Sequence, residues 1–328
     1  MQKIKIVWNP ADSPNLQRQW FQSLINRDFE WLEYAPDRHY SPDTVIMTVY
    51  QTAWHSERPW YQHLQDQGHK VIVDHLWDSD VDAPSSVQND QLVLRCGNWF
   101  WYRHCLQWIW SGDDQYQPSR AHTRAFLMLM NKQRKHRDRA LEVLAPVLDR
   151  AIYSYVDRGL ILPNDVPHDG STKLHWTYST NPEWYNSTFF SVVVESYMRT
   201  SAWLANPQLP NLKTEVNEKT FKTMAYHHPF ITFGSYEALA YLRREGFVTW
   251  DNLWDESYDL IEDDHKRFDA VTELVLDTVG RWDRGELTID QETKRRLAHN
   301  HARFFDRALV EQRMQQEIFD VIQEFANA

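Results

Sequence analysis

The sequence predicts an α/β fold made of two units of mostly parallel sheet and a helical tail. Short apolar runs of strand length alternate with helix-like segments over the first 250 residues, and the chain reads as helical from about residue 260 to its end. A length of 328 residues also suggests about two domains. We expect Rossmann-like domains at 1–120 and 121–260, and a tail at 261–328 that packs back on them.

The first half alternates apolar strand-like runs with longer, helix-like segments. Gly68 stands between one such segment and the next apolar run, where a helix end is expected. The residues 98–110 (NWFWYRHCLQWIW) are almost continuously aromatic or apolar and predict a buried helix. We expect strands at 3–8, 44–50, 70–76 and 91–97, and helices at 15–26, 56–67 and 98–110.

The second half repeats this alternation, with long polar loops after 156 and at 199–215. We expect strands at 124–130, 151–156, 189–196, 229–234 and 247–250, helices at 134–149, 217–228 and 235–246, and amphipathic helical segments near 265–280, 290–310 and 311–326. Ligands of such sheets bind outside the carboxyl ends of strands, so the loops that follow strands are the first places to look for a site.

Charge and composition restrict the classes of function. The net charge is −11, which disfavours a protein that grips a nucleic-acid backbone through a general basic field. Two cysteines, Cys96 and Cys105, are too few for a disulfide framework, and no apolar run is long enough to cross a bilayer. We expect a cytoplasmic protein, in the host cytoplasm if a virus encodes it. The 16 Trp residues fit core packing or flat surfaces for a sugar or base.

A basic segment follows the expected strand 124–130 directly. Residues 131–137 (NKQRKHR) stand at a strand-to-helix junction, where backbone N–H groups and arginines form a site for a diphosphate. The alternative is a solvated basic turn that opens a surface helix.

Two further segments carry carboxylates at the ends of elements. Glu218 and Lys219 open the helix expected at 217–228, where a carboxylate can accept from ribose hydroxyls and an ammonium can pair with phosphate. Acidic residues also favour a first helical turn for reasons unrelated to function. Glu195 ends the apolar strand FFSVVVES, which is costly unless its carboxylate is paired, faces a cleft or emerges into solvent.

The order of these elements resembles the donor-binding half of GT-B glycosyltransferases. The likeness is to the α-1,3-fucosyltransferase family (glycosyltransferase family 10) and, more loosely, to exostosin-like transferases. That family has a strand ending in Phe-Glu-Asn, a loop, Thr-Glu-Lys opening a helix, and then a Pro-led strand and Gly. Here the corresponding segments are Val194-Glu195-Ser196, Asn217-Glu218-Lys219 and 229–234, preceded by the basic segment 129–137.

The resemblance implies a GT-B-like fold, with two Rossmann-like domains facing a cleft, and a nucleotide-sugar donor. Glu218 would hold the ribose; Lys219, with Arg134 or Arg137 and the nearby Asn131, would bind the diphosphate. Glu195 would orient the donor or its pocket. Ser196, Asn217 and a longer loop depart from the family pattern, so the base stays open between UDP- and GDP-sugars.

The resemblance further implies a metal-independent and inverting transfer, whose base comes from the N-terminal domain. The candidates are Asp74 and His75 after KVIV, and His55 and Glu57 after TVIMTVY, and Asp74 is preferred because it directly ends an apolar run. We interpret the Asp78-Ser79-Asp80 triplet as a chance pattern and not as a metal site. His227 and His228 are adjacent on a helix and point about 100° apart, so they are poorly placed to share an ion.

The acceptor and the catalytic status leave alternatives open. A glycan hydroxyl is the default acceptor, and a hydroxymethylated pyrimidine in DNA is an alternative, served by a local basic groove around 132–139. A non-catalytic carbohydrate-binding or interaction protein on the same fold is a further alternative, in which the segment 98–110 would contact sugar.

Overall fold

The computed structural model describes residues 4–8, 29–33, 45–49, 66, 68–74, 86–88, 91–94, 98–119, 121–162, 181–196, 198 and 216–328. The chain forms two compact units. The first contains Met1–Tyr102 and Arg307–Ala328, and the second contains Arg103–Asp306. The expected boundaries lie at 120 and 260, whereas here the first lies after Tyr102 and the residues from Arg307 onward join the first unit.

The first unit contains a six-stranded sheet of order β2-β1-β3-β4-β6-β5, parallel except for β5 against β6. The strands β2 and β5 were not predicted. β2 is an edge strand that carries Glu30 and Glu33, and β5 has three residues, so neither presents the apolar run of a central strand. The strands are β1 (Ile4–Trp8), β2 (Phe29–Glu33), β3 (Val45–Val49), β4 (Lys70–Asp74), β5 (Ser86–Gln88) and β6 (Gln91–Leu94).

The end of the chain belongs to this first unit. It consists of α11 (Arg307–Met314), a π-helical turn (Gln315–Phe319) and α12 (Asp320–Asn327). The Lys70 ammonium of β4 donates to the carbonyl oxygens of Phe325 and Ala326 at 3.1 and 3.2 Å, which satisfies acceptors that a helix end leaves open. The buried stripe of these helices is Val310, Met314, Ile318, Ile322 and Phe325.

The second unit contains a fully parallel, four-stranded sheet of order β10-β9-β7-β8. From β7 (Arg124–Met130) the chain goes to β8 (Ala151–Tyr155) on one side, and then to β9 (Thr188–Val194) and β10 (Phe230–Phe233) on the other. The strand order therefore reverses between β7 and β9. An α/β sheet opens a crevice at such a point, outside the carboxyl ends of the two strands.

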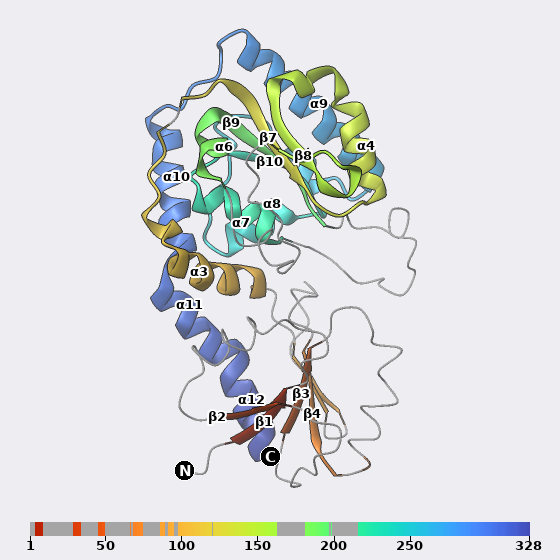
Figure 1. Cartoon of the computed structure of the whole chain (residues 1–328), viewed down its shortest axis with the longest axis vertical. Helices are drawn as coiled ribbons and strands as arrows, with labels where there is room; N and C mark the ends of the chain where they lie inside the picture. Colours follow the sequence, from red (N-terminus) through yellow and green to blue (C-terminus); the bar gives the residue numbers. More distant parts are fainter. Residues whose placement is uncertain are drawn as a thin grey trace. The chain divides into compact units, whose positions relative to one another are not determined.

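The two faces of this sheet differ in polarity. Phe126 and Phe190 are paired in register and lie on one face, as does Phe233, which packs against Phe268 of α9 (Asp264–Asp283). α4 (Lys135–Val143) lies beside α9 (Figure 1), joined to it by the Arg139–Asp269 ion pair. The other face contains Leu127, Leu129, Ser154 and Ser191, and it carries α6 (Pro182–Ser187) and α7 (Glu218–Ala225).

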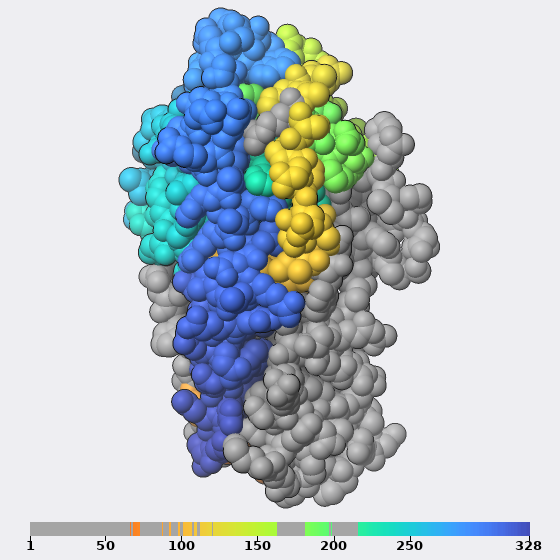
Figure 2. Space-filling model, turned by 90° about the vertical axis from the view of Figure 1, so that its left-hand side faces the viewer, coloured from red at the N-terminus to blue at the C-terminus, as the bar shows by residue number. Residues whose placement is uncertain are grey.

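Further helices close the second unit around α7. Figure 2 shows the segment that leads to β7 running alongside α10 (Gln291–Phe304), where His301 contacts the Asp114 carbonyl oxygen at 3.0 Å. The helix expected at 98–110 is confirmed as α3 (Trp99–Ser111), and its Trp101 and Trp108 are buried, as core packing requires. The remaining helices are α8 (Ala238–Arg244) and the 3₁₀ turns Asp113–Gln115, Ala145–Arg150, Val156–Arg158 and Ser257–Leu260.

Two expectations are corrected. The helix expected at 134–149 is α-helical only to Val143 and continues as a 3₁₀ helix that contains Pro146. The interpretation of 247–250 as a strand is wrong. The Asn300 side chain accepts from the Val248 N–H at 2.9 Å and donates to its carbonyl at 2.8 Å, so an amide side chain replaces the neighbouring strand.

The predicted α/β fold, with a mostly parallel sheet in each half and helices at the C-terminus, is confirmed. No helix in the described part of the chain combines the length and the apolar character needed to cross a membrane.

Candidate functional site

A cavity of about 1020 Å³, counting its open mouth, lies where the strand order of the second sheet reverses. It extends over the face of the sheet that carries α6 and α7. All five residues that the sequence predicts for donor binding line this cavity, together with Lys132. They are Asn131, Arg134, Arg137, Glu218 and Lys219.

The loop after β7 is held by the last residue of β8 and by a residue that follows it. The Gln133 N–H donates to the Asp157 carboxylate at 3.0 Å, and the Arg134 N–H donates to the Tyr155 hydroxyl at 3.2 Å. The Asn131 carbonyl oxygen accepts from the Asp157 N–H at 3.1 Å. The path of the loop from Asn131 to Arg134 is therefore set before any ligand binds.

The two arginines of this segment have different surroundings. Arg137 is 2 % exposed, and its guanidinium donates to the Lys132 carbonyl at 2.8 Å and to the Val194 carbonyl at 3.2 Å. It therefore ties the loop after β7 to the end of β9, and burial lowers its pKa. Arg134 is only half-buried and donates to the adjacent Gln133 carbonyl at 3.0 Å. Arg134 is the better placed of the two to contact an anion.

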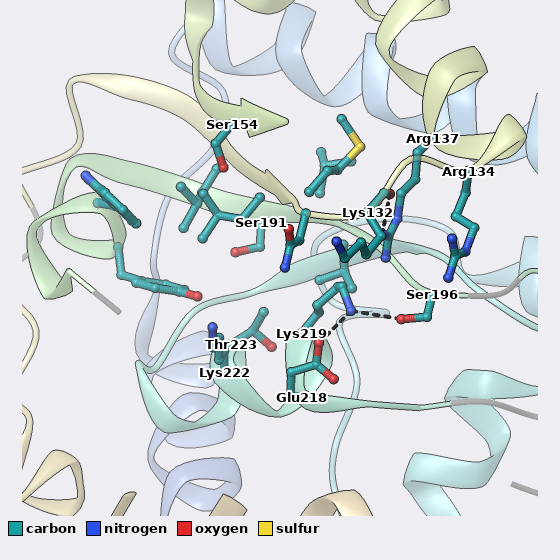
Figure 3. A pocket seen from close by; sticks show the side chains of 18 residues that line it. Lys132, Arg134, Arg137, Ser154, Ser191, Ser196, Glu218, Lys219, Lys222 and Thr223 are labelled. Atoms are coloured by element: carbon teal, nitrogen blue, oxygen red, sulfur yellow. Dashed lines mark hydrogen bonds and ion pairs between the residues drawn. The ribbon is translucent and has the colours of Figure 1, made fainter. Parts of the chain in front are cut away.

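The loop after β7 and the start of α7 lie on opposite sides of the cavity (Figure 3), and their charged residues form what we call its charged end: Lys132, Arg134, Arg137, Glu218 and Lys219. The Asn217 side chain caps the helix by accepting from the Lys219 N–H at 3.1 Å. The Lys219 ammonium donates to Ser196 Oγ at 3.1 Å and to the Glu218 carboxylate at 2.6 Å. Lys219 is thus fixed across the gap between the end of β9 and α7.

Glu218 is ionised at every ordinary pH. Burial disfavours its charged form, but the adjacent Lys219 ammonium and other basic groups outweigh burial and lower its pKa to about 2. Arg103 of α3 also interacts electrostatically with Glu218, and burial lowers the pKa of Arg103 to about 10. An ionised carboxylate only accepts hydrogen bonds, which is the property that two ribose hydroxyls need in a partner.

Glu195 lies behind the cavity and is not part of its lining. Its side chain accepts from the Asn217 N–H at 3.2 Å and from the Thr220 hydroxyl at 2.6 Å, and the residue is 1 % exposed. Burial raises the pKa of its carboxyl, although Lys219 and Thr220 act in the opposite direction. This geometry suits a residue that positions α7, and the role in orienting the donor or its pocket that the resemblance implies for Glu195 stays a prediction.

The other end of the cavity is one that sequence reasoning missed. Trp184 and Tyr185 of α6 line it, together with Ser154, Ser191 and Thr223. The two serines interrupt the otherwise apolar or aromatic strands AIYSY and TFFSVVV, and a hydroxyl in a buried strand marks a polar network or a cavity. That signal was available in the sequence, whereas α6 lay within an expected loop.

The predicted acceptor-side residues are not tested by these contacts. Asp74 is the last residue of β4, and its side chain, His75, His55 and Glu57 lie outside the described residues, as do Asp78 and Asp80. No group of three or more His, Cys, Asp or Glu side chains in the described ranges is arranged to hold a metal ion. His227 stacks on His301 at 4.0 Å, and His228 contacts Ser191 and Thr188 instead.

No protein-family model matches the chain, and no curated protein matches it in sequence. One similar solved structure is an alpha1,3-fucosyltransferase with GDP-fucose, with a TM-score of 0.34 and 11 % sequence identity, over 92 % of this chain and 90 % of that one.

Proposed function

We propose that this chain is a nucleotide-sugar-dependent glycosyltransferase whose second unit binds the donor. The observation that carries the proposal is the charged end of the cavity. There, the Glu218–Lys219 pair of α7 and the Arg134 loop both line the opening outside the carboxyl ends of β7 and β9. An anionic diphosphate and a ribose diol are complementary to this combination.

Each group has a defined task in the proposed reaction. The ionised Glu218 accepts from the ribose hydroxyls, and Lys219 and Arg134 donate to the diphosphate. As the bond from the sugar carbon to the diphosphate breaks, negative charge grows on the leaving oxygen. Cations already fixed near that oxygen stabilise the transition state more than the ground state. The N-terminus of α7 adds a favourable dipole.

The rest of the reaction follows from the proposed class. We propose an inverting transfer without a metal, in which Asp74 or His75 removes the proton of the acceptor hydroxyl. A glycan is the default acceptor, and a hydroxymethylated pyrimidine in DNA is the alternative. Product analysis with both acceptors would distinguish them.

Binding of uridine and guanosine diphosphates, followed by isothermal titration calorimetry, tests the proposal. We expect one of them to bind the wild-type chain, and Lys219→Ala to weaken that binding roughly 10- to 100-fold through the loss of one charge-assisted hydrogen bond. Lys266→Ala is the matched control, because Lys266 is exposed on α9 and does not line the cavity. Equal affinities of the two variants would contradict the assignment.

A further inference from the structure

The cavity has an interior end that the charged groups do not explain. In Figure 3, Ser154 and Ser191 lie toward one end of the cavity, whereas Arg134 and Arg137 lie toward the other. Leu127 is in register with Ser191, and the Tyr185 ring meets that of His228, which is hydrogen-bonded to Ser191. These two residues and Trp184, which precedes Tyr185 in α6, therefore line the interior end together with Ser191. Flat, apolar walls of this kind bind planar rings.

One of these walls is held rigidly. The Tyr185 ring stacks on Tyr226, with centroids 4.7 Å apart, and meets the His228 ring edge-on at 5.2 Å. Tyr185 is 4 % exposed, and burial raises the pKa of its hydroxyl. The ring is fixed from two sides before a ligand arrives, so a ligand does not have to order it.

Ser191 presents an acceptor, and the direction of its hydrogen bond follows from its partners. His228 Nε2 lies 2.8 Å from the Thr188 carbonyl oxygen, which can only accept, so Nε2 carries the proton. In a neutral imidazole the other nitrogen, Nδ1, is then an acceptor. Ser191 Oγ lies 2.7 Å from Nδ1 and therefore donates its proton to it. The lone pairs of Ser191 Oγ are left to accept a hydrogen bond.

Two residues of α7 complete the polar groups of this end. The Thr223 hydroxyl donates to the Thr220 carbonyl at 2.7 Å, so its oxygen is likewise left as an acceptor. Lys222, which also lines the cavity, is 8 % exposed, and its ammonium brings up to three N–H donors. Acceptors and a donor thus line the same end of the cavity.

We propose that the interior end binds the base of the nucleotide through a lactam edge, an N–H group beside a C=O group, and that Ser191 is the specificity-determining residue. The ring N–H donates to Ser191 Oγ, and the ring carbonyl accepts from Lys222. Uracil and guanine carry such an edge, whereas adenine and cytosine do not. This inference rests on the proposed function, because the same ligand places its diphosphate at the charged end.

The test compares nucleoside diphosphates that differ at the ring N–H, by titration calorimetry. The pairs are uridine diphosphate with its N3-methyl analogue and guanosine diphosphate with its N1-methyl analogue. For whichever parent binds, we expect N-methylation to weaken binding to the wild-type chain about 10-fold or more. Adenosine and cytidine diphosphates should bind at least as weakly as the methylated analogue. These comparisons use only the wild-type chain, so they do not depend on whether a variant folds.

The variants Ser191→Ala and Ser191→Thr test whether the Ser191 hydroxyl causes the discrimination against N-methylated bases. In Ser191→Ala the methylation penalty should fall to within about 3-fold, because the acceptor is gone. Ser191→Thr keeps the hydroxyl on a β-branched residue suited to a strand and should retain the penalty. A full penalty in Ser191→Ala, or equal binding of all four parent nucleotides, overturns this inference alone. Failure of every nucleoside diphosphate to bind overturns the proposed function as well.

Discussion

Arg134 and Arg137 lie three positions apart, yet one faces an opening and the other is built into the scaffold. The buried Arg137 guanidinium donates to carbonyl oxygens of the loop after β7 and of the end of β9, whereas Arg134 is half-exposed at the cavity. The distinction matters because a buried guanidinium that joins two backbone segments contributes to stability, whereas a half-exposed one at the cavity is accessible to a ligand. Replacement of Arg137 should therefore lower the stability of the fold, whereas replacement of Arg134 should weaken ligand binding.

Arg137→Ala is expected to reduce the free energy of unfolding by roughly 2–5 kcal/mol, because two carbonyl oxygens lose their donor in a buried place. Arg134→Ala should change it by no more than about 0.5 kcal/mol, as is usual for substitutions outside the core, while weakening nucleoside diphosphate binding about 10-fold. Urea unfolding and calorimetric titration of both variants give the two readouts. Similar losses of stability in the two would contradict the division of roles.

Glu195 gives a prediction about pH. Burial raises the pKa of its carboxyl in the folded chain, so the folded state binds more protons than the unfolded state above the ordinary pKa of about 4.5. The free energy of unfolding then falls as pH rises through the interval between the unfolded and the folded pKa. Glu195→Gln removes this dependence and keeps an oxygen that can accept from Asn217 and Thr220.

Urea unfolding of Glu195→Gln and of the wild-type chain, in steps from pH 4 to pH 8, measures this effect. We expect the variant to gain stability relative to the wild-type chain as the pH rises above about 4.5. A difference that stays constant over the whole range would show that the pKa of Glu195 is not raised.

At the scale of elements, the site depends on how α7 begins. The Asn217 side chain accepts from the Lys219 N–H and donates to Ser196 Oγ at 3.1 Å, so the helix cap also connects the helix to the end of β9. A cap elsewhere in the same unit provides a comparison. Asp290 accepts from the Thr293 N–H at 2.7 Å and starts α10, and neither residue lines the cavity.

Asn217→Ala and Asp290→Ala should each lower the free energy of unfolding by about 1 kcal/mol, the usual value of an N-cap. Only Asn217→Ala should also weaken nucleoside diphosphate binding, by about 10-fold, because Lys219 loses the two hydrogen bonds that its backbone N–H and its ammonium donate to the Asn217 side chain. Calorimetric titration separates the two variants. Equal binding by both would mean that the cap acts on stability alone.

The same elements show what the sequence could and could not predict. The strand 124–130 and the positions of Glu218 and Lys219 were predictable, because apolar runs and helix starts are local signals. The error at 247–250 has a non-local cause, since the partner of Val248 is a side chain 52 residues away. The interior end of the cavity was missed for a related reason. The hydrogen-bonding role of Ser191 depends on its contact with His228, which lies on the segment that leads into another strand.

At the scale of the whole molecule, the net charge of −11 argues against general binding to nucleic-acid backbones, and it is compatible with a small basic site. The charged end of the cavity gathers Lys132, Arg134, Arg137 and Lys219 within one unit. A sum over the chain carries no information about where its charges lie, and two phosphates require only a few cations. The excess of Trp is explained in part by the core, through Trp101, Trp108 and Trp250.

The division into units leads to a prediction about fragments. Every residue that lines the cavity lies between Leu127 and Thr223, inside the continuous second unit. The first unit is discontinuous and includes α11 and α12, whose buried apolar side chains each contribute roughly 1.5–3 kcal/mol.

A chain of residues 98–306 should therefore bind the nucleoside diphosphate within about 3-fold of the full chain. A chain that ends at residue 306 should bind it as well, but with its first unit unfolded, because that unit lacks its last helices. Calorimetric titration and far-ultraviolet circular dichroism measure the two properties separately, and loss of nucleotide binding by a folded 98–306 chain would show that the donor site needs the first unit.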